Sequence, residues 1–503
     1  MDDILLKVEL QGLGAKVKDL PPGVRQGGAG PAEGTVISFG GRQASVPLHS
    51  PFVARSPYYL KKQTDRYWLS RGRKKIREIR FPETPVFYGK RTWDGVPYSQ
   101  IALLHGEDCL GSTVVQSCIY QEAGKGCGFC GINESLKNKK TIVRKTPSHL
   151  AEVAAAAESE GVRHAVLTSG CWGDDSSVIH YLAECTRAIK QRTSLKVQAQ
   201  FNPPANPELL NVLKDAGVDT VGIHIESFDS PVLKQVSPHK ARVGRKGYRR
   251  CWQEAVGIFG RNQVISFLIA GLGESKQSLI KGCEELAKLG VYPHVVPLRP
   301  IPGTKMANRR PPAPARMRGI YEKAAFAVRN AGLSWRTITA GCGRCPACSA
   351  LGEFEDYLAE KEVACQIART DDELDTCYRI RHQVFVEEQG IFKGSDRDEM
   401  DAEAIHIIAK AGDVVQGTVR LNRKYDGQWW GSRLAVIPKY RGIAGRSLVR
   451  KAEETVREKK GKVLRAYIQE NRVDFFKQLG WKDIGGPTQY CGLPHQLMEA
   501  DLY

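Results

Sequence analysis

Three cysteines between residues 118 and 130 have the spacing of a metal-binding loop. Cys118, Cys127 and Cys130 are arranged as C-x8-C-x2-C, and the aromatic Phe129 precedes the last thiol. Three thiolates can ligate three irons of a [4Fe–4S] cube and leave the fourth iron open for a substrate or cofactor. The alternative interpretation is a zinc loop whose fourth ligand lies elsewhere. The spacing predicts an iron–sulfur site.

A second group of thiols lies further along the chain. Cys342, Cys345 and Cys348 have the spacing C-x2-C-x2-C, which predicts an auxiliary iron–sulfur cluster or a structural zinc. Cys109 and Cys171 are candidate extra ligands, although a packed thiol is the simpler interpretation of each. The amino terminus lacks the features of a secretory signal, so we expect reduced thiols that are free to bind metals.

Strands and helices alternate from about residue 100 onward. The apolar runs predict strands at 113–116, 164–169, 197–201, 220–226, 264–270 and 291–298, with helices at 147–159, 178–189, 207–216, 248–259, 276–289 and 313–331. Six such units predict an α/β fold with a partial (β/α)6 barrel. Loops that follow the strands form the chemical face of such barrels. The loop of Cys118 directly follows the first expected strand.

This region resembles the radical SAM enzymes, whose first cysteine gap is usually five residues shorter. The segment 168–170 resembles their small-residue motif, and 269–274 resembles their G-x-I-x-G-x-x-E motif. The resemblance implies S-adenosylmethionine (SAM), a reductant such as flavodoxin or ferredoxin, and hydrogen abstraction by a 5′-deoxyadenosyl radical. The residues expected to bind SAM are Thr168, Ser169, Gly170, Glu226, Gly271 and Glu274.

The C-terminal part contains a strand, a glycine-rich turn and a helix expected at 447–459. Backbone N–H groups at such a helix start can hold a pyrophosphate. The turn resembles the acetyl-CoA loop of GNAT acetyltransferases, and segments 384–390 and 471–481 agree with that family. The resemblance implies acetyl-CoA bound by Val436, Arg441, Gly442, Ala444, Gly445, Arg446 and Asn471.

One position bears on acetyl transfer. Many GNAT enzymes have a tyrosine general acid in the late helix, where this chain has Phe476. Glu388, Tyr467 or Glu470 are the candidate catalytic residues in its place, with Tyr490 as a further alternative. Whether the domain transfers acetyl groups or only binds acetyl-CoA stays open at this stage.

The 503 residues divide into four expected segments. We expect an irregular lead-in at residues 1–100, the radical SAM barrel with its second cysteine cluster at 101–352, a linker at 353–362, and the GNAT domain at 363–503. No apolar run has the length of a membrane span, so we expect a cytoplasmic protein without a membrane partner. The net charge of +19 includes basic clusters at 71–80 and 240–250, which we interpret as a solvated surface or phosphate anchors rather than a nucleic-acid site.

The whole chain resembles a fusion of two bacterial proteins. Residues 35–352 are similar to the radical SAM protein of a nitrilase-associated gene cluster, through segments such as 94–98 and 340–345. Residues 363–503 are similar to its companion, a nitrogen-starvation N-acetyltransferase, through 394–399 and 495–500. This resemblance implies nitrogen metabolism and a small nitrogen-containing substrate of unknown identity. The alternatives are an Elongator-like enzyme that modifies tRNA wobble uridine, and a non-catalytic Fe–S or CoA sensor.

Overall fold

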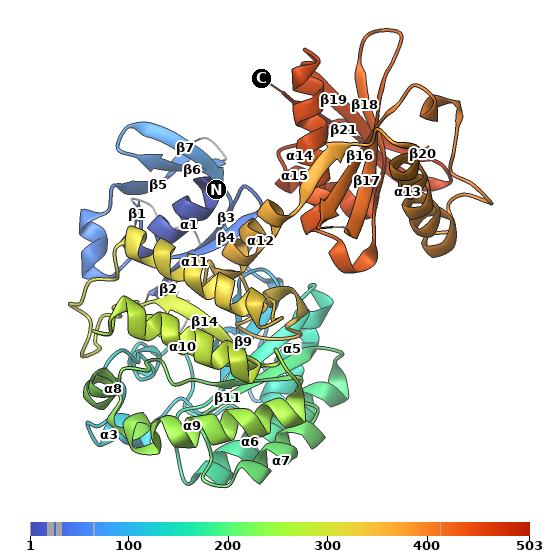
Figure 1. Cartoon of the computed structure of the whole chain (residues 1–503). Coiled ribbons are helices and arrows are strands. Elements are labelled where there is room, and N and C mark those ends of the chain that lie inside the picture. Colours follow the sequence, from blue (N-terminus) through green and yellow to red (C-terminus); the bar gives the residue numbers. More distant parts are fainter. Residues whose placement is uncertain (1, 18–24, 27–32, 64–65, 413, 503) are drawn as a thin grey trace. The chain divides into compact units, whose positions relative to one another are not determined.

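The computed structural model describes residues 2–17, 25–26, 33–63, 66–412 and 414–502. The chain folds into two compact units, Met1–Glu355 and Asp356–Tyr503, which are drawn in Figure 1. No helix in the described part of the chain is both long enough and apolar enough to cross a membrane.

The main sheet of the first unit has seven strands in the order β14-β13-β12-β11-β10-β9-β8. Six of them are parallel and follow one another in chain order, and only β8 (Leu103–His105) is antiparallel to its neighbour. The sheet is curved into a half-barrel, as the sequence predicted. The parallel strands are β9 (Cys109–Thr113), β10 (His164–Thr168), β11 (Lys196–Phe201), β12 (Thr220–Ile223), β13 (Val264–Ala270) and β14 (Val291–Pro297).

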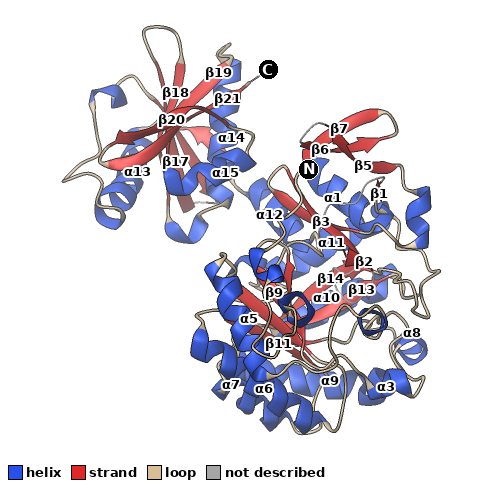
Figure 2. Ribbon diagram, turned by 180° about the vertical axis from the view of Figure 1, so that it is seen from behind, coloured by secondary structure: helices blue, strands red, loops and turns tan. Residues whose placement is uncertain are grey.

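Helices connect these strands and cover the outer face of the sheet (Figure 2). The sequence marks their ends: the Ser275 side chain caps the helix that begins at Lys276, and Gly290 ends it in a left-handed conformation with φ 87°. The long helices are α5 (Pro147–Ser159), α6 (Asp175–Arg192), α9 (Pro238–Phe259), α10 (Lys276–Leu289) and α11 (Pro314–Asn330). Shorter ones are α2 (Tyr98–Ile101), α3 (Ile119–Glu122), α4 (Glu134–Lys137), α7 (Leu210–Asp215) and α8 (Ser230–Val236).

The first strand expected from the sequence was placed four residues too far along the chain. Strand β9 ends at Thr113, where the expected strand 113–116 was to begin. The apolar pair Val114–Val115 misled the sequence analysis, because these residues are buried in the loop that leads to Cys118. The other expected strands and helices coincide with observed elements, with differences of a few residues at their ends, except that the helix expected at 248–259 begins ten residues earlier, at Pro238.

The segment before residue 100, expected to be irregular, forms two small sheets and a helix in its described part. Residues 18–24, 27–32 and 64–65 of that segment lie outside the description. Inward-facing Leu60, Leu69 and Ile79 are at most 2% exposed and give these strands a core, an alternation that the sequence analysis missed. The elements are α1 (Asp2–Leu13), β1 (Lys16–Val17), β2 (Arg25–Gln26), β3 (Glu33–Phe39), β4 (Arg42–Val46), β5 (Tyr58–Gln63), β6 (Arg66–Arg71) and β7 (Lys74–Ile79).

The expected linker 353–362 is also ordered, because it belongs to helix α12 (Leu351–Glu362). Leu351 and Phe354 have the helical i, i+3 spacing and are fully buried. Glu353 forms an ion pair with Lys7 of α1, and the Tyr292 hydroxyl donates a hydrogen bond to Glu355 (2.6 Å). The first half of this helix is therefore part of the packed first unit.

The second unit is a seven-stranded sheet in the order β15-β16-β17-β18-β19-β21-β20. All neighbours are antiparallel except β18 and β19, which are parallel and pair only at two positions, Trp429 with Leu464 and Trp430 with Arg465. Beyond these positions the two strands separate. The strands are β15 (Ala364–Ile367), β16 (Ile405–Ala411), β17 (Val414–Arg423), β18 (Trp429–Val436), β19 (Val463–Gln469), β20 (Lys482–Tyr490) and β21 (Leu493–Asp501).

Helix α14 (Ile443–Glu458) packs its apolar stripe on this sheet. Leu448, Val449, Ala452 and Val456 are at most 3% exposed and contribute to the core with residues from β16 to β21. Helix α13 (Asp371–His382) continues into a π-helical turn, Gln383–Glu388, and α15 (Val473–Gln478) follows β19. The helix expected at 447–459 thus begins four residues earlier, immediately after the glycine-rich turn.

Candidate active sites

The loop of Cys118 lies directly against the segment that follows β10. Gly170 donates its N–H to the carbonyl of Val115 (2.9 Å), and Ile119 donates to the carbonyl of Cys171 (2.9 Å). A Cβ atom at position 170 would lie 1.8 Å from the carbonyl oxygen of Ser117. Only glycine permits this close approach. The structure therefore brings the predicted motif 168–170 and the cysteine loop together at the carboxyl ends of the strands.

Cys118 has the most acidic thiol of the loop. Its pKa is lowered to about 5, chiefly because the Cys171 thiol donates a hydrogen bond to it, although burial opposes this shift. The backbone at the start of α3 donates further hydrogen bonds. The same contact and burial raise the pKa of Cys171, whose sulfur also accepts a hydrogen bond from the Asn202 amide (2.9 Å). These hydrogen bonds favour the thiolate of Cys118, the form that binds metals.

Burial opposes ionisation of the other two thiols of the loop, Cys127 and Cys130. Burial raises the pKa of Cys127 to about 12, against the influence of Lys240, and burial also raises the pKa of Cys130. The Cys127 sulfur is 3.8 Å from Nε2 of His239, at the beginning of α9. The loop is fixed by Gly128, which donates to the carbonyl of Val236 (2.8 Å).

A buried ion pair lies beside these thiols. Lys240 donates to both carboxylate oxygens of Glu226 (2.7 Å each) and to the carbonyl of His224 (2.8 Å), and both side chains are less than 10% exposed. Burial raises the pKa of Glu226 despite Lys240. Burial opposes the charge of Lys240, but the Glu226 carboxylate outweighs it and raises the pKa of the lysine. The Glu226 backbone has φ 63°, an unfavourable conformation that points to a functional constraint.

The side chains of Glu274 and Ser169, two other residues predicted to bind SAM, form hydrogen bonds that shape the turns in which they lie. The Glu274 carboxylate accepts the backbone N–H groups of Gly271 (3.0 Å) and Gly273 (3.2 Å) and pairs with Arg316 (3.1 Å). It therefore shapes its own turn after β13. Thr168 ends β10, and the Ser169 hydroxyl donates to the carbonyl of Gly170 (2.8 Å). The Thr168 carbonyl accepts the N–H of Val114 (2.8 Å), in the segment that leads to Cys118.

The residues present fit a cluster with SAM. Within the described ranges, no three or more His, Cys, Asp or Glu side chains gather closely enough to hold a single metal ion. A [4Fe–4S] cube is wider than an ion and takes one thiolate at each of three irons. Cys118, Cys127 and Cys130 form such a donor set, since electrostatic interactions connect Cys130 with Cys118 and Cys127 with Cys130. The nearby Lys240 and Glu226 both act electrostatically on Cys127 and Cys130.

The second site is built around the turn between β18 and α14. Gly442 has φ 93° and precedes the first residue of the helix, so the backbone N–H groups of Ile443, Ala444 and Gly445 begin α14. Helix starts of this kind attract phosphate groups. Val436 ends β18 where that strand has already separated from β19. Val436, Arg441, Gly442, Ala444 and Gly445 thus lie along one continuous segment, from the end of β18 to the start of α14.

Two predicted residues from different segments meet at this turn. Arg441 donates a hydrogen bond to the Glu388 carboxylate (2.5 Å), and this bond lowers the pKa of Glu388. Next to it, the Gln469 amide at the end of β19 donates to Gln389 (3.0 Å). A carboxylate with a lowered pKa is a weak base. Glu388 is therefore better suited to orient Arg441 than to accept a proton.

The remaining acetyl-transfer candidates are separated. Tyr467 is 39% exposed on β19 and stacks on Tyr490, with ring centroids 5.3 Å apart. Glu470 and Asn471 are exposed in the 3-10 turn after β19. Arg446 pairs with Glu360 (3.1 Å) within the same unit.

Phe476, which replaces the tyrosine of other GNAT enzymes, is 6% exposed and packs on Trp481. The neighbouring Phe475 lies over the start of α14 instead, 3.6 Å from a Cβ at Gly445. The tyrosine position is therefore part of the core here.

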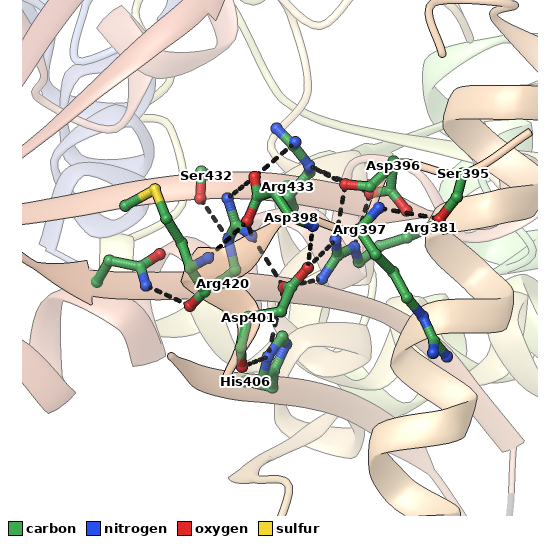
Figure 3. A network of polar contacts seen from close by, with 12 residues as sticks. Arg381, Ser395, Asp396, Arg397, Asp398, Asp401, His406, Arg420, Ser432 and Arg433 are labelled. Carbon is green, nitrogen blue, oxygen red and sulfur yellow. Dashed lines mark hydrogen bonds and ion pairs between the residues drawn. The ribbon is translucent and has the colours of Figure 1, made fainter. Parts of the chain in front are cut away.

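A network of buried charges holds the helix that leads to Glu388 (Figure 3). Arg381 of α13 donates to Asp396 (2.7 Å) and to Asp401 (2.6 Å). Arg420 of β17 donates to Asp401 (2.9 Å), and Arg433 of β18 donates to Asp398 (3.0 Å). Three arginines thus balance three aspartates and attach the loop 396–401 to α13 and to the sheet.

Sequence reasoning missed the buried position of Lys240 and the contact between Cys171, named only as a candidate extra ligand, and Cys118. Lys240 stands in a basic cluster that the sequence analysis interpreted as a surface or as phosphate anchors, yet it is 7% exposed. The start of its helix, 238–247, was not predicted, so no helical face marked it as inward. Cys171 directly follows the motif 168–170, and that adjacency was the available signal.

Comparison with known proteins finds one family match in each unit. Residues 123–286 match the Radical SAM superfamily, and residues 368–481 match the Acetyltransferase (GNAT) family. The chain is 24% identical over 332 residues to the bacteriochlorophyllide c C-7(1)-hydroxylase of Chlorobaculum limnaeum, covering 62% of this chain and 81% of that protein.

Two matches concern the second unit alone. The chain is 28% identical over 139 residues to the uncharacterized N-acetyltransferase YjcF of Bacillus subtilis, covering 27% of this chain and 97% of that protein. The crystal structure of Escherichia coli ElaA is 22% identical, with a TM-score of 0.26, and covers 28% of this chain and 99% of that chain. The family matches confirm the α/β fold class and the two enzyme domains.

Proposed function

We propose that this chain, an enzyme that joins a radical SAM domain to a GNAT acetyltransferase domain, cleaves SAM reductively and abstracts hydrogen from a small nitrogen-containing substrate. The observation that carries the proposal is the convergence of Cys118, Cys127 and Cys130 with Gly170 and with the Glu226–Lys240 pair. A bound cluster supplies one electron, received from flavodoxin or ferredoxin, that splits SAM into methionine and a 5′-deoxyadenosyl radical.

The residues of this chain have distinct tasks in the proposal. The three thiolates ligate three irons and leave the fourth free for the amino and carboxylate groups of SAM. Gly170 lets the backbone after β10 approach the cluster loop. Glu226 accepts a hydrogen bond from the SAM amino group or ribose, and Lys240 offsets part of the cost of burying that carboxylate. Burial of the site excludes water, which protects a reactive radical from side reactions.

The GNAT domain transfers an acetyl group from acetyl-CoA to an amine. The start of α14 and Arg441 bind the pyrophosphate, and Glu388 orients Arg441. Exposed Tyr467 and Glu470 are the remaining candidates for proton transfer, since Phe476 has no hydroxyl. The resemblance to the nitrilase-associated pair supports a nitrogen-metabolism substrate for both domains, without naming it.

The test is anaerobic reconstitution with iron and sulfide, followed by measurement of 5′-deoxyadenosine from SAM with dithionite. We expect product from the native chain and none from Cys127→Ala, with Cys283→Ala as a matched control because that buried thiol lies on α10. A fully loaded protein that forms no 5′-deoxyadenosine would instead support the non-catalytic sensor.

A second candidate function, tRNA modification of the Elongator type, is favoured by the basic sheet of β1, β5, β6 and β7. Its cations stack on aromatic rings: Lys16 lies 4.5 Å from the centroid of Tyr59, and Lys75 lies 4.6 Å from that of Trp68. Such surfaces bind polyanions through charge and stacking. A tRNA mobility shift that weakens steeply with salt would support this candidate, and no shift at low salt would remove it.

A further inference from the structure

The second cysteine loop closes the end of the half-barrel opposite to the Cys118 loop. Gly341 donates its N–H to Nδ1 of His164 (3.0 Å), the first residue of β10. The hydroxyl of Thr220, the first residue of β12, donates to the carbonyl of Ala340 (3.2 Å). Parallel strands begin at one end of a barrel and finish at the other. The loop 340–348 is therefore anchored at the amino ends of the strands.

Cys109 lies at the same end, although it is more than 230 residues earlier in the chain. It is the first residue of β9 and the register partner of His164. The turn before it carries Gly106, where a Cβ would lie 3.1 Å from the sulfur of Cys345. Asp108, in the same turn, is 3.8 Å from the guanidinium of Arg344. Two contacts thus connect the β8–β9 turn to the cysteine loop.

The four thiols are near enough to interact electrostatically. Cys345, Cys342 and Cys348 each act on the Cys109 thiol, and Cys348 acts on Cys342. Cys109 and Cys345 are buried, and Cys342 and Cys348 are partly buried. Thiolates gathered in this way repel one another unless they share a metal centre.

Two glutamines of β11 face the loop with atoms suited to a metal–thiolate site. The Gln200 amide donates a hydrogen bond to the sulfur of Cys342 (3.2 Å), and Gln198 accepts the N–H of Cys342 (3.1 Å). Gln198 is fully buried, yet its Nε2 has no hydrogen-bond partner among the described residues. A buried donor without an acceptor is costly. Cluster sulfides are acceptors of the kind that this amide lacks.

We propose that Cys109, Cys342, Cys345 and Cys348 hold a second [4Fe–4S] cluster at the amino ends of the barrel strands. Three cysteines spaced C-x2-C-x2-C with a fourth from a distant segment form a ferredoxin-type ligand set, whereas zinc sites more often use two separate pairs. All four irons have protein ligands, so this cluster has no open position for SAM. Its chemistry is therefore the transfer of electrons.

The test measures iron, acid-labile sulfide and zinc in anaerobically reconstituted full-length protein. With two cubes we expect about eight irons per chain, and about seven or fewer in Cys109→Ala, because the second site then keeps three thiolates and leaves one iron without a protein ligand. The control variant Cys283→Ala replaces a buried cysteine of α10 and should keep about eight irons per chain. Unchanged iron in Cys109→Ala would overturn the assignment of the fourth ligand.

A second variant keeps the proposal testable if Cys109→Ala does not fold. Replacing Cys118, Cys127 and Cys130 by alanine together removes the first site and leaves the second intact. We expect this variant to retain about four irons and an electron paramagnetic resonance (EPR) signal of the reduced cluster that does not change when SAM is added. Zinc in place of iron, or no metal, would contradict the proposal. The result is independent of SAM cleavage, so failure of the proposed function is distinguished from failure of this inference.

Discussion

Replacing Lys240 by methionine removes the only ammonium that the described residues place on the Glu226 carboxylate. The lysine nitrogen is 2.7 Å from each carboxylate oxygen, and the two side chains are 9% and 8% exposed. Breaking one partner of a buried pair typically lowers the free energy of unfolding by about 3–5 kcal/mol, because the other charge stays buried and uncompensated. We expect a loss in this range for Lys240→Met.

The loss should depend on pH with a definite sign. Burial already raises the pKa of Glu226, and without Lys240 it rises further. A carboxyl group whose pKa is higher in the folded than in the unfolded state contributes its full stabilisation below the unfolded-state pKa. This contribution is lost as pH increases through the folded-state pKa. Lys240→Met should therefore lose more stability near pH 8 than near pH 5.

The assay is urea denaturation of the full chain at both pH values. Arg250→Met, an exposed member of the same basic cluster, is the matched control and should change stability by less than about 0.5 kcal/mol. The double variant Lys240→Met/Glu226→Gln removes the stranded charge and should recover most of the loss and its pH dependence. A loss below about 1 kcal/mol for Lys240→Met at both pH values would refute this reasoning.

Three further predictions concern other contacts. Gly170→Ala places a Cβ on the carbonyl of Ser117 and should reduce the iron content after reconstitution. The control Gly257→Ala, whose Cβ meets no atom within 4 Å, should leave the iron content unchanged. Equal iron contents in the two variants would contradict the close approach of Gly170 to the cysteine loop. Arg441→Ala should weaken acetyl-CoA binding by about 10- to 100-fold in calorimetry, since a charged hydrogen bond contributes roughly 1.5–3 kcal/mol; unchanged affinity would show that Arg441 is not a phosphate ligand. Hydrogen bonds from arginines lower the pKa of Asp401 against the effect of burial, so the stability that this carboxylate contributes is lost as pH falls below about 4. Asp401→Asn should reduce the decrease of the melting temperature at acid pH. An unchanged decrease would exclude this aspartate as its origin.

The barrel was predictable because its strands are continuous apolar runs between amphipathic helices. Val264–Ala270 and Lys276–Leu289 were predicted at the observed bounds, since burial on both faces and a capped amphipathic helix leave clear patterns. The N-terminal sheets were missed because their strands are short and many of their outward residues are lysine or arginine. Such strands resemble loops in composition, and only pairing over long distances stabilises them.

The sites were predictable where chemistry depends on local spacing. The two cysteine loops and the turn before α14 are each encoded in fewer than 20 consecutive residues. Contacts between distant segments left no such pattern. The pairing of Lys240 with Glu226, of Arg441 with Glu388, and of Cys109 with the loop 340–348 depends on register and helix direction, which one sequence does not reveal.

The account depends most on an iron atom that the Cys118 loop leaves without a protein ligand. The direct measurement is EPR of the reduced cluster at the first site, in a variant with Cys342, Cys345 and Cys348 replaced by alanine. We expect the signal to shift when SAM is added, because SAM binds the open iron. A reduced cluster whose spectrum is identical with and without SAM would contradict the account.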